Sequence, residues 1–513
     1  MTVDYDLIII GGSTAGTYAA VAAAHLNARV ALVVSEDIPS NWLGYGAVYN
    51  LALAQVGHVI QQVYSTPQFG ILSPNHELTE QGQVPLINLT EVRKWIQTMV
   101  TNCSERNSPA ILRSLGVDVI TGKGEFCRLP YLGFVVNNRR LRARAYLIAT
   151  GSRPTIPDIP GLPTIGYLTP ADIWQERTVK VRERKSEGNW DSTQHATPKV
   201  YPQLQGSWVV IGGSPMGVQL AQTLGRLNCR VTLVTKASHI LVKEDSEASL
   251  LVQAQLEAEG IEVLTQSPIT QVRQIGNKKW VQAGNRAIEA DEILLATAQQ
   301  LNLESLNLEG VGVKFNPQGL QLNQKLQTTN SRIYATCEDT TNDYEFSQIA
   351  EYEAHIALKN ALFAPVFQVN YQNIPWAIYC KPQLAGVGLT EVQARERYGK
   401  DILAVRQYFK TLDKAQLLGE TTGFCKLLVR RNGEIVGASL VGAEANELIG
   451  AIALAMQHKI KLGAIAKLPQ ASPTLSEIVH KSAIEWQRQR LAGNKTLQNF
   501  LECFFNLRRK WSK

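Results

Sequence analysis

The sequence has few cysteines, and they are widely spaced. It has seven among 513 residues, with no C-x-x-C pair, and the nearest two are Cys103 and Cys127. This spacing excludes the common zinc motifs, so we expect no bound metal. Sparse, unpaired cysteines are typical of proteins in a reducing compartment.

Long apolar runs are also missing. The N-terminus, MTVDYDLIII, has no basic segment and no long apolar stretch, so it does not predict a signal peptide. No run reaches the about 18 apolar residues of a membrane-spanning helix. Charged residues are slightly scarce at 19%, and a net charge of +7 over this length does not argue for nucleic acid. We expect a cytoplasmic protein with no nucleic-acid partner, at most peripheral to a membrane.

What the sequence does contain is a nucleotide-binding pattern at its N-terminus. Residues 6–10 (DLIII) are a short apolar run typical of a buried parallel strand, and the turn GGSTAG follows at 11–16. An alanine-rich helix is predicted at 17–27 and another strand at 30–34. A glycine turn in this place lets a pyrophosphate bind at the N-terminus of the helix.

The same pattern recurs later in the chain. An apolar strand is predicted at 207–211, followed by the turn GGSPMG at 212–217, a helix at 218–228 and a strand at 231–234. Two such units suggest two dinucleotides that meet in one protein. The alternative is that both are α/β folds with glycine-rich turns and no nucleotide.

The order of these motifs resembles the pyridine nucleotide–disulfide oxidoreductases, which include glutathione reductase, lipoamide dehydrogenase and mercuric reductase. The first unit fits their FAD domain, together with ATGSRP at 149–154 and QTTNSRIYATCED at 327–339. The second unit fits their NAD(P)H domain. PQLAGVGLTEVQA and SPTLSEIVH fit their dimerisation domain, so the likeness covers residues 4 to about 486.

The resemblance implies an α/β protein with two Rossmann-like dinucleotide-binding domains and an α+β C-terminal dimerisation domain, assembled as a homodimer. The implied parts are an FAD domain at 1–165 and 299–365, an NAD(P) domain at 166–298, a dimerisation domain at 366–490 and a basic amphipathic tail at 491–513. Residues 176–206 are a polar, basic insertion in the NAD(P) domain, and we expect a surface loop there.

The resemblance also places the cofactors. FAD is expected at Gly11, Gly12, Ser13, Gly16, Glu36, Thr150, Gly151, Glu338 and Asp339. NAD(P)H is expected at Gly212, Gly213, Ser214, Gly217 and Lys236. Ser13 and Ser214 each stand where the family has a glycine. A serine side chain leaves a pyrophosphate less room to approach the backbone, although its hydroxyl can donate a hydrogen bond to the pyrophosphate. Lys236 stands where NAD enzymes often carry an acid, which favours NADPH over NADH. It could equally be a solvated surface charge.

The family's redox groups are missing. Aligned from Gly11, the two redox cysteines fall on Trp42 and Ala47. The catalytic histidine falls on Ser472, while its partner acid remains as Glu477. Without a thiolate pair and a base, the disulfide chemistry of the family has no groups to perform it at these positions.

A charged pair beside the flavin has also changed. The family's lysine and glutamate at this place fall on Asn50 and Gln219, which are both neutral amides. Losing one partner would leave a buried, unpaired charge at a cost of several kcal/mol. Losing both together leaves two groups that can still hydrogen-bond, which suggests a retuned site.

Two readings of the function follow. Hydride transfer needs a nicotinamide held against a flavin and no dithiol, so reduced flavin could pass electrons to a quinone, a dye, a metal ion or oxygen. The alternative is a pseudoenzyme, a dimeric scaffold or nucleotide sensor without turnover. A disulfide reductase that uses other cysteines, such as Cys337, is a third reading, against which stands the ordinary role of buried thiols as inert packing.

The tail adds a final expectation. Its end, KTLQNFLECFFNLRRKWSK (495–513), has apolar residues at helical spacing and clustered cations. This pattern suits a helix on an anionic membrane. The alternative is a helix that folds back onto the protein's own surface or its dimer partner.

Overall fold

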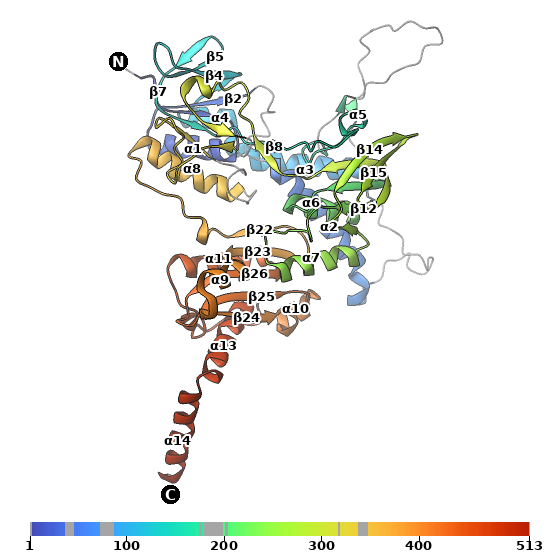
Figure 1. The fold of residues 1–513 in the computed structure, drawn as a ribbon, viewed down its shortest axis with the longest axis vertical. Helices are drawn as coiled ribbons and strands as arrows, with labels where there is room; N and C mark the ends of the chain where they lie inside the picture. Colours follow the sequence, from blue (N-terminus) through green and yellow to red (C-terminus); the bar gives the residue numbers. More distant parts are fainter. Residues whose placement is uncertain are drawn as a thin grey trace. The chain divides into compact units, whose positions relative to one another are not determined.

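The structure, a computed structural model, divides the chain into two compact units (Figure 1). It describes residues 3–35, 46–71, 87–173, 177–178, 199–200, 204–316, 319–336 and 347–511. Unit 1 comprises Met1–Ser238 and Glu259–Val369, and unit 2 comprises His239–Ala258 and Asn370–Lys513.

The first sheet of unit 1 is parallel and holds the N-terminal strand at its centre. Its order is β21 (Ile333–Ala335), β7 (Ala143–Ile148), β1 (Tyr5–Ile10), β2 (Val30–Val34) and β3 (Asp118–Thr121). The apolar run of β1 is buried on both faces. Leu7 and Ile9 belong to one core cluster, whereas Ile8 and Ile10 belong to another.

Different elements cover the two faces of this sheet. Helices α1 (Thr14–His25) and α8 (Ser347–Leu362) pack on one face, and an antiparallel meander of β4 (Gly124–Cys127), β5 (Gly133–Val136) and β6 (Arg139–Leu141) covers the other (Figure 1). Further helices of this part are α2 (Gly46–Tyr64), α3 (Leu89–Ser104) and α4 (Pro109–Ser114).

The second glycine unit builds another parallel sheet in unit 1. Its order is β13 (Glu262–Leu264), β12 (Arg230–Val234), β11 (Ser207–Ile211) and β17 (Glu292–Leu295), with α6 (Pro215–Arg226) between β11 and β12. Nearby elements are α5 (Leu162–Ile165) and the antiparallel strands β14 (Ile269–Ile275), β15 (Lys278–Ala283) and β16 (Arg286–Ala290). Both strand–helix–strand units predicted from the sequence are confirmed.

Three short strand pairs also lie in the described part of unit 1. They are β8 (Ser152–Pro154) with β18 (Gln299–Leu301), β19 (Phe315–Asn316) with β20 (Gly319–Leu320), and β9 (Arg177–Thr178) with β10 (Lys199–Val200). The last pair lies within the predicted insertion at 176–206, and residues 179–198 between its strands lie outside the described residues.

Unit 2 is built on an antiparallel sheet. Its order is β22 (Trp376–Ile378), β23 (Gln383–Gly388), β26 (Ile435–Gly442), β25 (Phe424–Arg430) and β24 (Ile402–Tyr408). Its helices are α7 (Ser246–Ala258), α9 (Glu391–Tyr398), α10 (Asp413–Leu418), α11 (Ala445–Gln457), α12 (Leu462–Ile465), α13 (Glu477–Ala492) and α14 (Lys495–Trp511). None of the described helices is long and apolar enough to cross a membrane. The domain boundaries given above stay predictions.

A buried charge cluster fixes α7 to this sheet. The side chain of Lys426 is 3% exposed, and its Nζ lies 2.8 Å from Oδ1 of Asp245 and 2.7 Å from Oε2 of Glu247. Glu391 accepts from both Lys426 and Arg406. Burial alone would lower the pKa of Lys426, but its hydrogen bonds to Asp245 and Glu247 outweigh burial and raise it. Because a buried cation must be paired, these contacts account for the grouping of α7 with unit 2.

The cluster predicts a pH-dependent effect of Glu247→Gln. We expect the free energy of unfolding to fall by about 0.5 kcal/mol at neutral pH. The value is small because the Glu247 side chain is 39% exposed, so solvent screens its ion pair with Lys426. Burial alone would raise the pKa of Glu247, but hydrogen bonds from Lys426 and Arg406 bring it below its ordinary 4.5. Such a carboxylate stabilises fully above its unfolded pKa and ceases to do so as pH falls through its folded pKa.

The difference in unfolding free energy between wild type and Glu247→Gln should therefore be constant above about pH 5. It should shrink below about pH 4, where Glu247 of the wild type itself becomes neutral. Urea unfolding of wild type and variant across this range measures it. A deficit that grows as the pH falls would contradict the assignment.

Candidate functional site

The first glycine turn is tightly constrained by its neighbours. Gly11 follows β1 with φ +113°, and a Cβ built on it would lie 2.1 Å from the carbonyl oxygen of Ala149. Ser13 is the N-cap of α1, where its Oγ accepts a hydrogen bond from the backbone N–H of Gly16 at 3.3 Å. Only glycine fits at residue 11, and the backbone there turns into the N-terminus of α1, which suits a pyrophosphate.

The predicted A-T-G segment lies against this turn. The hydroxyl oxygen of Thr150 is buried and has no hydrogen-bond partner among the described residues. A buried polar atom without a partner costs about 1–3 kcal/mol, and a polar ligand held beside the turn could pair with it. The conformation of Gly11 and the unpaired Thr150 hydroxyl both fit a bound dinucleotide such as FAD.

The second turn repeats the first in detail. Gly212 has φ +124°, and a Cβ there would lie 2.2 Å from the carbonyl oxygen of Ala296. The hydroxyl of Ser214 donates to that same carbonyl at 2.8 Å and accepts from the N–H of Gly217 at 3.2 Å. The Ser214 proton is thus engaged within the protein. Pro215, the first residue of α6, has no N–H, and the N–H of Gly217 is bonded to Ser214, so a pyrophosphate here would depend on the other backbone N–H groups of the turn. Lys236, after β12, is exposed.

The two neutral amides lie on packed helices. Asn50 on α2 is 4% exposed and Gln219 on α6 is 6% exposed. The helices α2 and α6 contact each other, and the Nδ2 of Asn50 donates to the Sδ of Met216 at 3.5 Å, in the first turn of α6. The Nε2 of Gln219 is buried without a hydrogen-bond partner among the described residues. A ligand atom that accepts a hydrogen bond would satisfy it.

In unit 2, the structure brings Ser472 and Glu477 together. The Glu477 carboxylate accepts hydrogen bonds from the Ser472 side chain and from the N–H of Thr474, the latter at 3.1 Å. These bonds, in that order, lower the pKa of Glu477. A carboxylate with a lowered pKa is a weak base, and a serine that donates to it does not replace a histidine in proton transfer.

Several predicted site residues cannot be placed. Trp42, Glu36, Glu338 and Asp339 lie outside the described residues. Ala47 belongs to α2, but its side chain lies outside the description as well. Their roles stay predictions.

Sequence reasoning missed the role of Asn302. Its Nδ2 donates to the carbonyl of Thr150 at 3.2 Å, its N–H donates to the carbonyl of Gly151 at 3.0 Å, and its Oδ1 accepts from Arg153. It follows β18, which pairs with β8 beside the A-T-G segment. The available signal was the repeat of Ala-Thr at 149–150 and 296–297, and the pairing of β8 with β18 is what places the two segments side by side.

The described cysteines do not form a substitute redox pair. None of the six described cysteines forms a disulfide: Cys229, Cys380 and Cys425 are buried, Cys103 and Cys127 are half-buried, and Cys503 is exposed. Burial raises the pKa of Cys229 to about 12 and, as its largest cause, that of Cys425 to about 12. Thiols held protonated in this way are poor nucleophiles. Cys337 lies outside the described residues.

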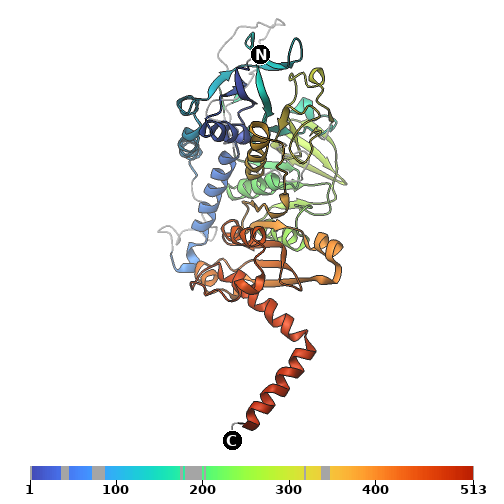
Figure 2. The same ribbon diagram turned by 90° about the vertical axis from the view of Figure 1, so that its left-hand side faces the viewer.

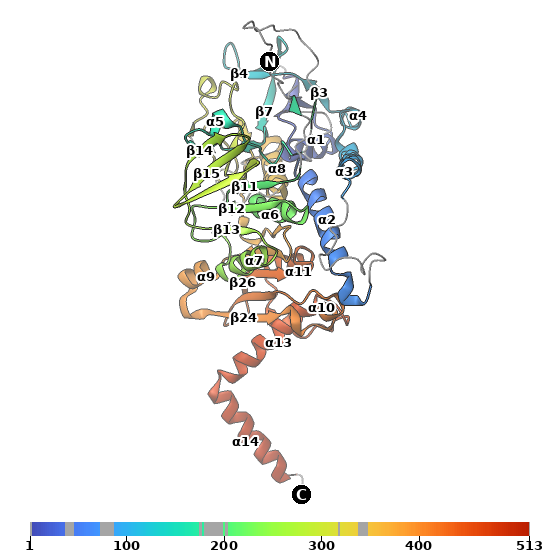
Figure 3. The ribbon, with the colours of Figure 1, turned by 90° about the vertical axis from the view of Figure 1, so that its right-hand side faces the viewer.

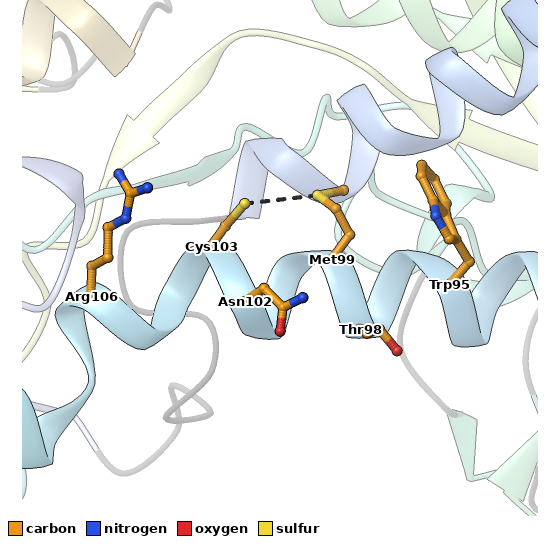
Figure 4. Close-up of a pocket in the computed structure, with 6 residues that line it drawn as sticks. All are labelled: Trp95, Thr98, Met99, Asn102, Cys103 and Arg106. Carbon is orange, nitrogen blue, oxygen red and sulfur yellow. Dashed lines mark hydrogen bonds between the residues drawn. The ribbon is translucent and has the colours of Figure 1, made fainter.

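A surface pocket of about 500 Å³ lies along α3 (Figure 4). Its described lining residues are Trp95, Thr98, Met99, Asn102, Cys103 and Arg106. The Cys103 thiol contacts the Met99 sulfur at 3.8 Å, and no second cysteine is among these residues. The pocket therefore offers no thiol pair.

Comparison with known proteins places the chain among flavoenzymes. Residues 5–354 match the family described as pyridine nucleotide-disulphide oxidoreductase, and residues 374–483 match its dimerisation domain. A mercuric reductase from Staphylococcus aureus is 30% identical over 465 residues, which span 90% of this chain and 78% of the relative. A dihydrolipoyl dehydrogenase from Bacillus subtilis (strain 168) is 28% identical over 487 residues, spanning 93% and 98%.

Solved structures agree in fold. LpdA from Mycobacterium tuberculosis matches with a TM-score of 0.77 and 22% identity, covering 93% of this chain and 99% of that one. A Cu(II) complex of RclA, an HOCl-induced flavoprotein disulfide reductase from Escherichia coli, matches with a TM-score of 0.75 and 21% identity, covering 94% and 100%. FAD and NAD(P)H are the cofactors that relatives in the family bind. The resemblance predicted from the sequence is confirmed, and the chain belongs to the pyridine nucleotide-disulphide oxidoreductase family.

Proposed function

We propose that the protein is an FAD-dependent NAD(P)H oxidoreductase that passes electrons to an acceptor other than a disulfide. The observation that carries this proposal is the contrast between two well-formed glycine turns, at Gly11 and Gly212, and a sequence with Trp42 and Ala47 in place of the redox cysteines. The two turns support nucleotide binding, and the resemblance implies that the thiol relay of the family is missing.

The FAD would be held by the turn at Gly11 and by the segment at Thr150, and NAD(P)H by the turn at Gly212 and by Lys236. When bound, the flavin supplies the step that accepts a hydride and passes on electrons. The exposed ammonium of Lys236 follows β12, where it can pair with a 2′-phosphate, so we expect NADPH to be preferred.

The protein's own residues then define the environment of the flavin. The buried Nε2 of Gln219 offers a hydrogen-bond donor without bringing a charge. Asn50, engaged with Met216, is neutral as well. The Ser472 side chain donates a hydrogen bond to the Glu477 carboxylate and lowers its pKa. The pair therefore does not supply the strong base that thiol chemistry requires. A quinone, a dye, a metal ion or oxygen needs no such base to take electrons.

Residues 374–483 match the dimerisation domain of the family. We propose a homodimer in which the Ser472–Glu477 segment of one chain lies near the flavin of the other, as the resemblance implies. A cytoplasmic location fits the sparse cysteines of the sequence.

The test is a comparison of acceptors on the purified full-length protein. We expect flavin absorbance that bleaches on anaerobic addition of NADPH, then turnover with a soluble quinone or a dye. We expect none with glutathione disulfide or lipoamide, because Trp42 and Ala47 stand where the family carries the cysteines that attack them.

Two outcomes would contradict the proposal. Disulfide turnover that is lost on alkylation would show that other cysteines of the chain react. A colourless protein that binds neither nucleotide would favour the alternative, a dimeric scaffold or sensor without turnover.

A further inference from the structure

The last helix of the chain presents an uncovered apolar face. All residues of α14 (Lys495–Trp511) are exposed except Leu501, which is half-buried. Figures 2 and 3 show α14 following α13 and extending beyond the strands of unit 2. A helix that folded back onto its own unit would bury one of its faces. No face of α14 is buried in this way.

Five of the six large apolar side chains exposed on α14 lie on one side of the helix. They are Leu497, Phe500, Phe504, Leu507 and Trp511, which follow each other at alternating steps of three and four residues. The sixth is Phe505, which is 48% exposed and packs edge-on against Phe504 at 5.4 Å between ring centroids. This spacing places them in one stripe along a helix. Trp511 is 83% exposed, and Phe500 is 63% exposed. Uncovered aromatic side chains in such a stripe need an apolar partner.

Basic residues accompany the stripe. Arg508, Arg509 and Lys510 form the last turn, and Glu502 is the single acidic residue of the helix. Cations at the C-terminus of a helix also complement its dipole, which accounts for their place but not for the aromatic stripe beside them. The combination of aromatic side chains and clustered cations is characteristic of helices that lie in the headgroup region of anionic bilayers.

A second copy of the chain is the other candidate partner for the stripe. In a helix pair built on these five residues, Arg508 and Lys510 would flank the contact on its two sides. Both are positive, whereas a stable homodimeric pair has complementary charges at these places and a longer apolar repeat. The charge pattern therefore favours a negatively charged surface over a second α14.

We propose that α14 binds the surface of an anionic lipid bilayer, lying in its plane with the Phe504 side facing the acyl chains. The helix would anchor the protein without spanning the membrane. This inference is independent of the reaction proposed above, because it rests on the exposed side chains and charge of α14 alone.

The test is flotation of the full-length protein with vesicles of phosphatidylcholine alone or mixed with phosphatidylserine. We expect binding to the mixed vesicles only, and a strong decrease as salt is raised. Replacing Arg508, Arg509 and Lys510 together by glutamine should weaken binding about a hundredfold, since each cation near such a surface contributes about fivefold.

A matched pair of variants separates the contribution of the apolar stripe to membrane binding from the contribution of net charge. Phe504→Glu and Asn506→Glu each add one negative charge, but residue 506 lies on the opposite side of the helix, where its side chain accepts a hydrogen bond from Arg509. We expect Phe504→Glu to abolish flotation and Asn506→Glu to weaken it only about fivefold. Circular dichroism and flavin content show whether each variant is folded.

Three results would overturn the proposal. The first is equal binding of both variants, and the second is equal binding to neutral and anionic vesicles. The third is an assembly larger than a dimer that forms without lipid and is lost in Phe504→Glu, which would assign the stripe to a second copy. Flotation does not depend on turnover, so the lipid inference and the proposed reaction can fail separately.

Discussion

Gly11→Ala is expected to yield a protein that purifies with at least about tenfold less bound flavin than wild type, which requires a loss of at least about 1.4 kcal/mol of binding free energy. The added Cβ would lie 2.1 Å from the carbonyl oxygen of Ala149 and 2.5 Å from the Cα of Thr150, and both neighbours are backbone. The φ of +113° adds strain for any residue with a Cβ. Absorbance at flavin and protein wavelengths measures the occupancy.

Gly116→Ala is the matched control. Gly116 also has a positive φ, +90°, but a Cβ there meets no atom within 4 Å. Gly116→Ala should lower the stability of the folded protein only by the backbone strain of the left-handed region, about 1 kcal/mol, and should leave the flavin content unchanged. If Gly11→Ala kept full flavin, the turn after β1 would not be the site of the cofactor.

The sequence predicted both parallel units because their signals are local. A short apolar run, a glycine turn and a helix lie within about 30 residues, so the pattern alone specifies the arrangement. The helix α14 was equally predictable from its spacing of apolar residues. By contrast, α7 lies within the stretch assigned to the NAD(P) domain, yet it packs with unit 2. That placement depends on Lys426 meeting Asp245, a contact between residues far apart in the chain.

In the candidate site too, local motifs were predictable from the sequence, whereas contacts between distant residues were not. The glycines and the Ala-Thr-Gly segment were found as motifs, since each has to be a specific residue type at a fixed place. The state of the serine hydroxyls was not predictable, because Ser214 donates to Ala296, a residue that only the fold brings near. Likewise, the sequence indicated only that the side chains of Asn50 and Gln219 can still hydrogen-bond. In the structure Asn50 donates to Met216, and the Nε2 of Gln219 has no partner among the described residues.

Gln219→Glu is expected to be the most destabilising single change where α2 packs on α6, lowering the free energy of unfolding by about 3–5 kcal/mol at neutral pH. Gln219 is 6% exposed, its Nε2 has no hydrogen-bond partner among the described residues, and residue 50 is an asparagine in place of the family's lysine. Burial without a partner raises the pKa of a carboxyl group, so the folded state would bind more protons than the unfolded state. The destabilisation should therefore shrink as the pH is lowered towards the unfolded pKa of about 4.3. Urea unfolding across this pH range measures both effects.

Adding Asn50→Lys to Gln219→Glu rebuilds the ion pair that the family carries. Each single variant buries one unpaired charge, whereas the double variant buries two charges that can compensate each other. We therefore expect the double variant to be more stable than either single variant, with a coupling of at least about 2 kcal/mol. Gln219→Met controls for shape, because it fills a similar volume without charge, and it should cost less than either charged single variant. Strictly additive losses would mean that residues 50 and 219 do not face each other. A recovered double variant would instead show that the chain keeps the geometry of the family's charged pair, so that the two neutral amides are a change of chemistry on an intact framework.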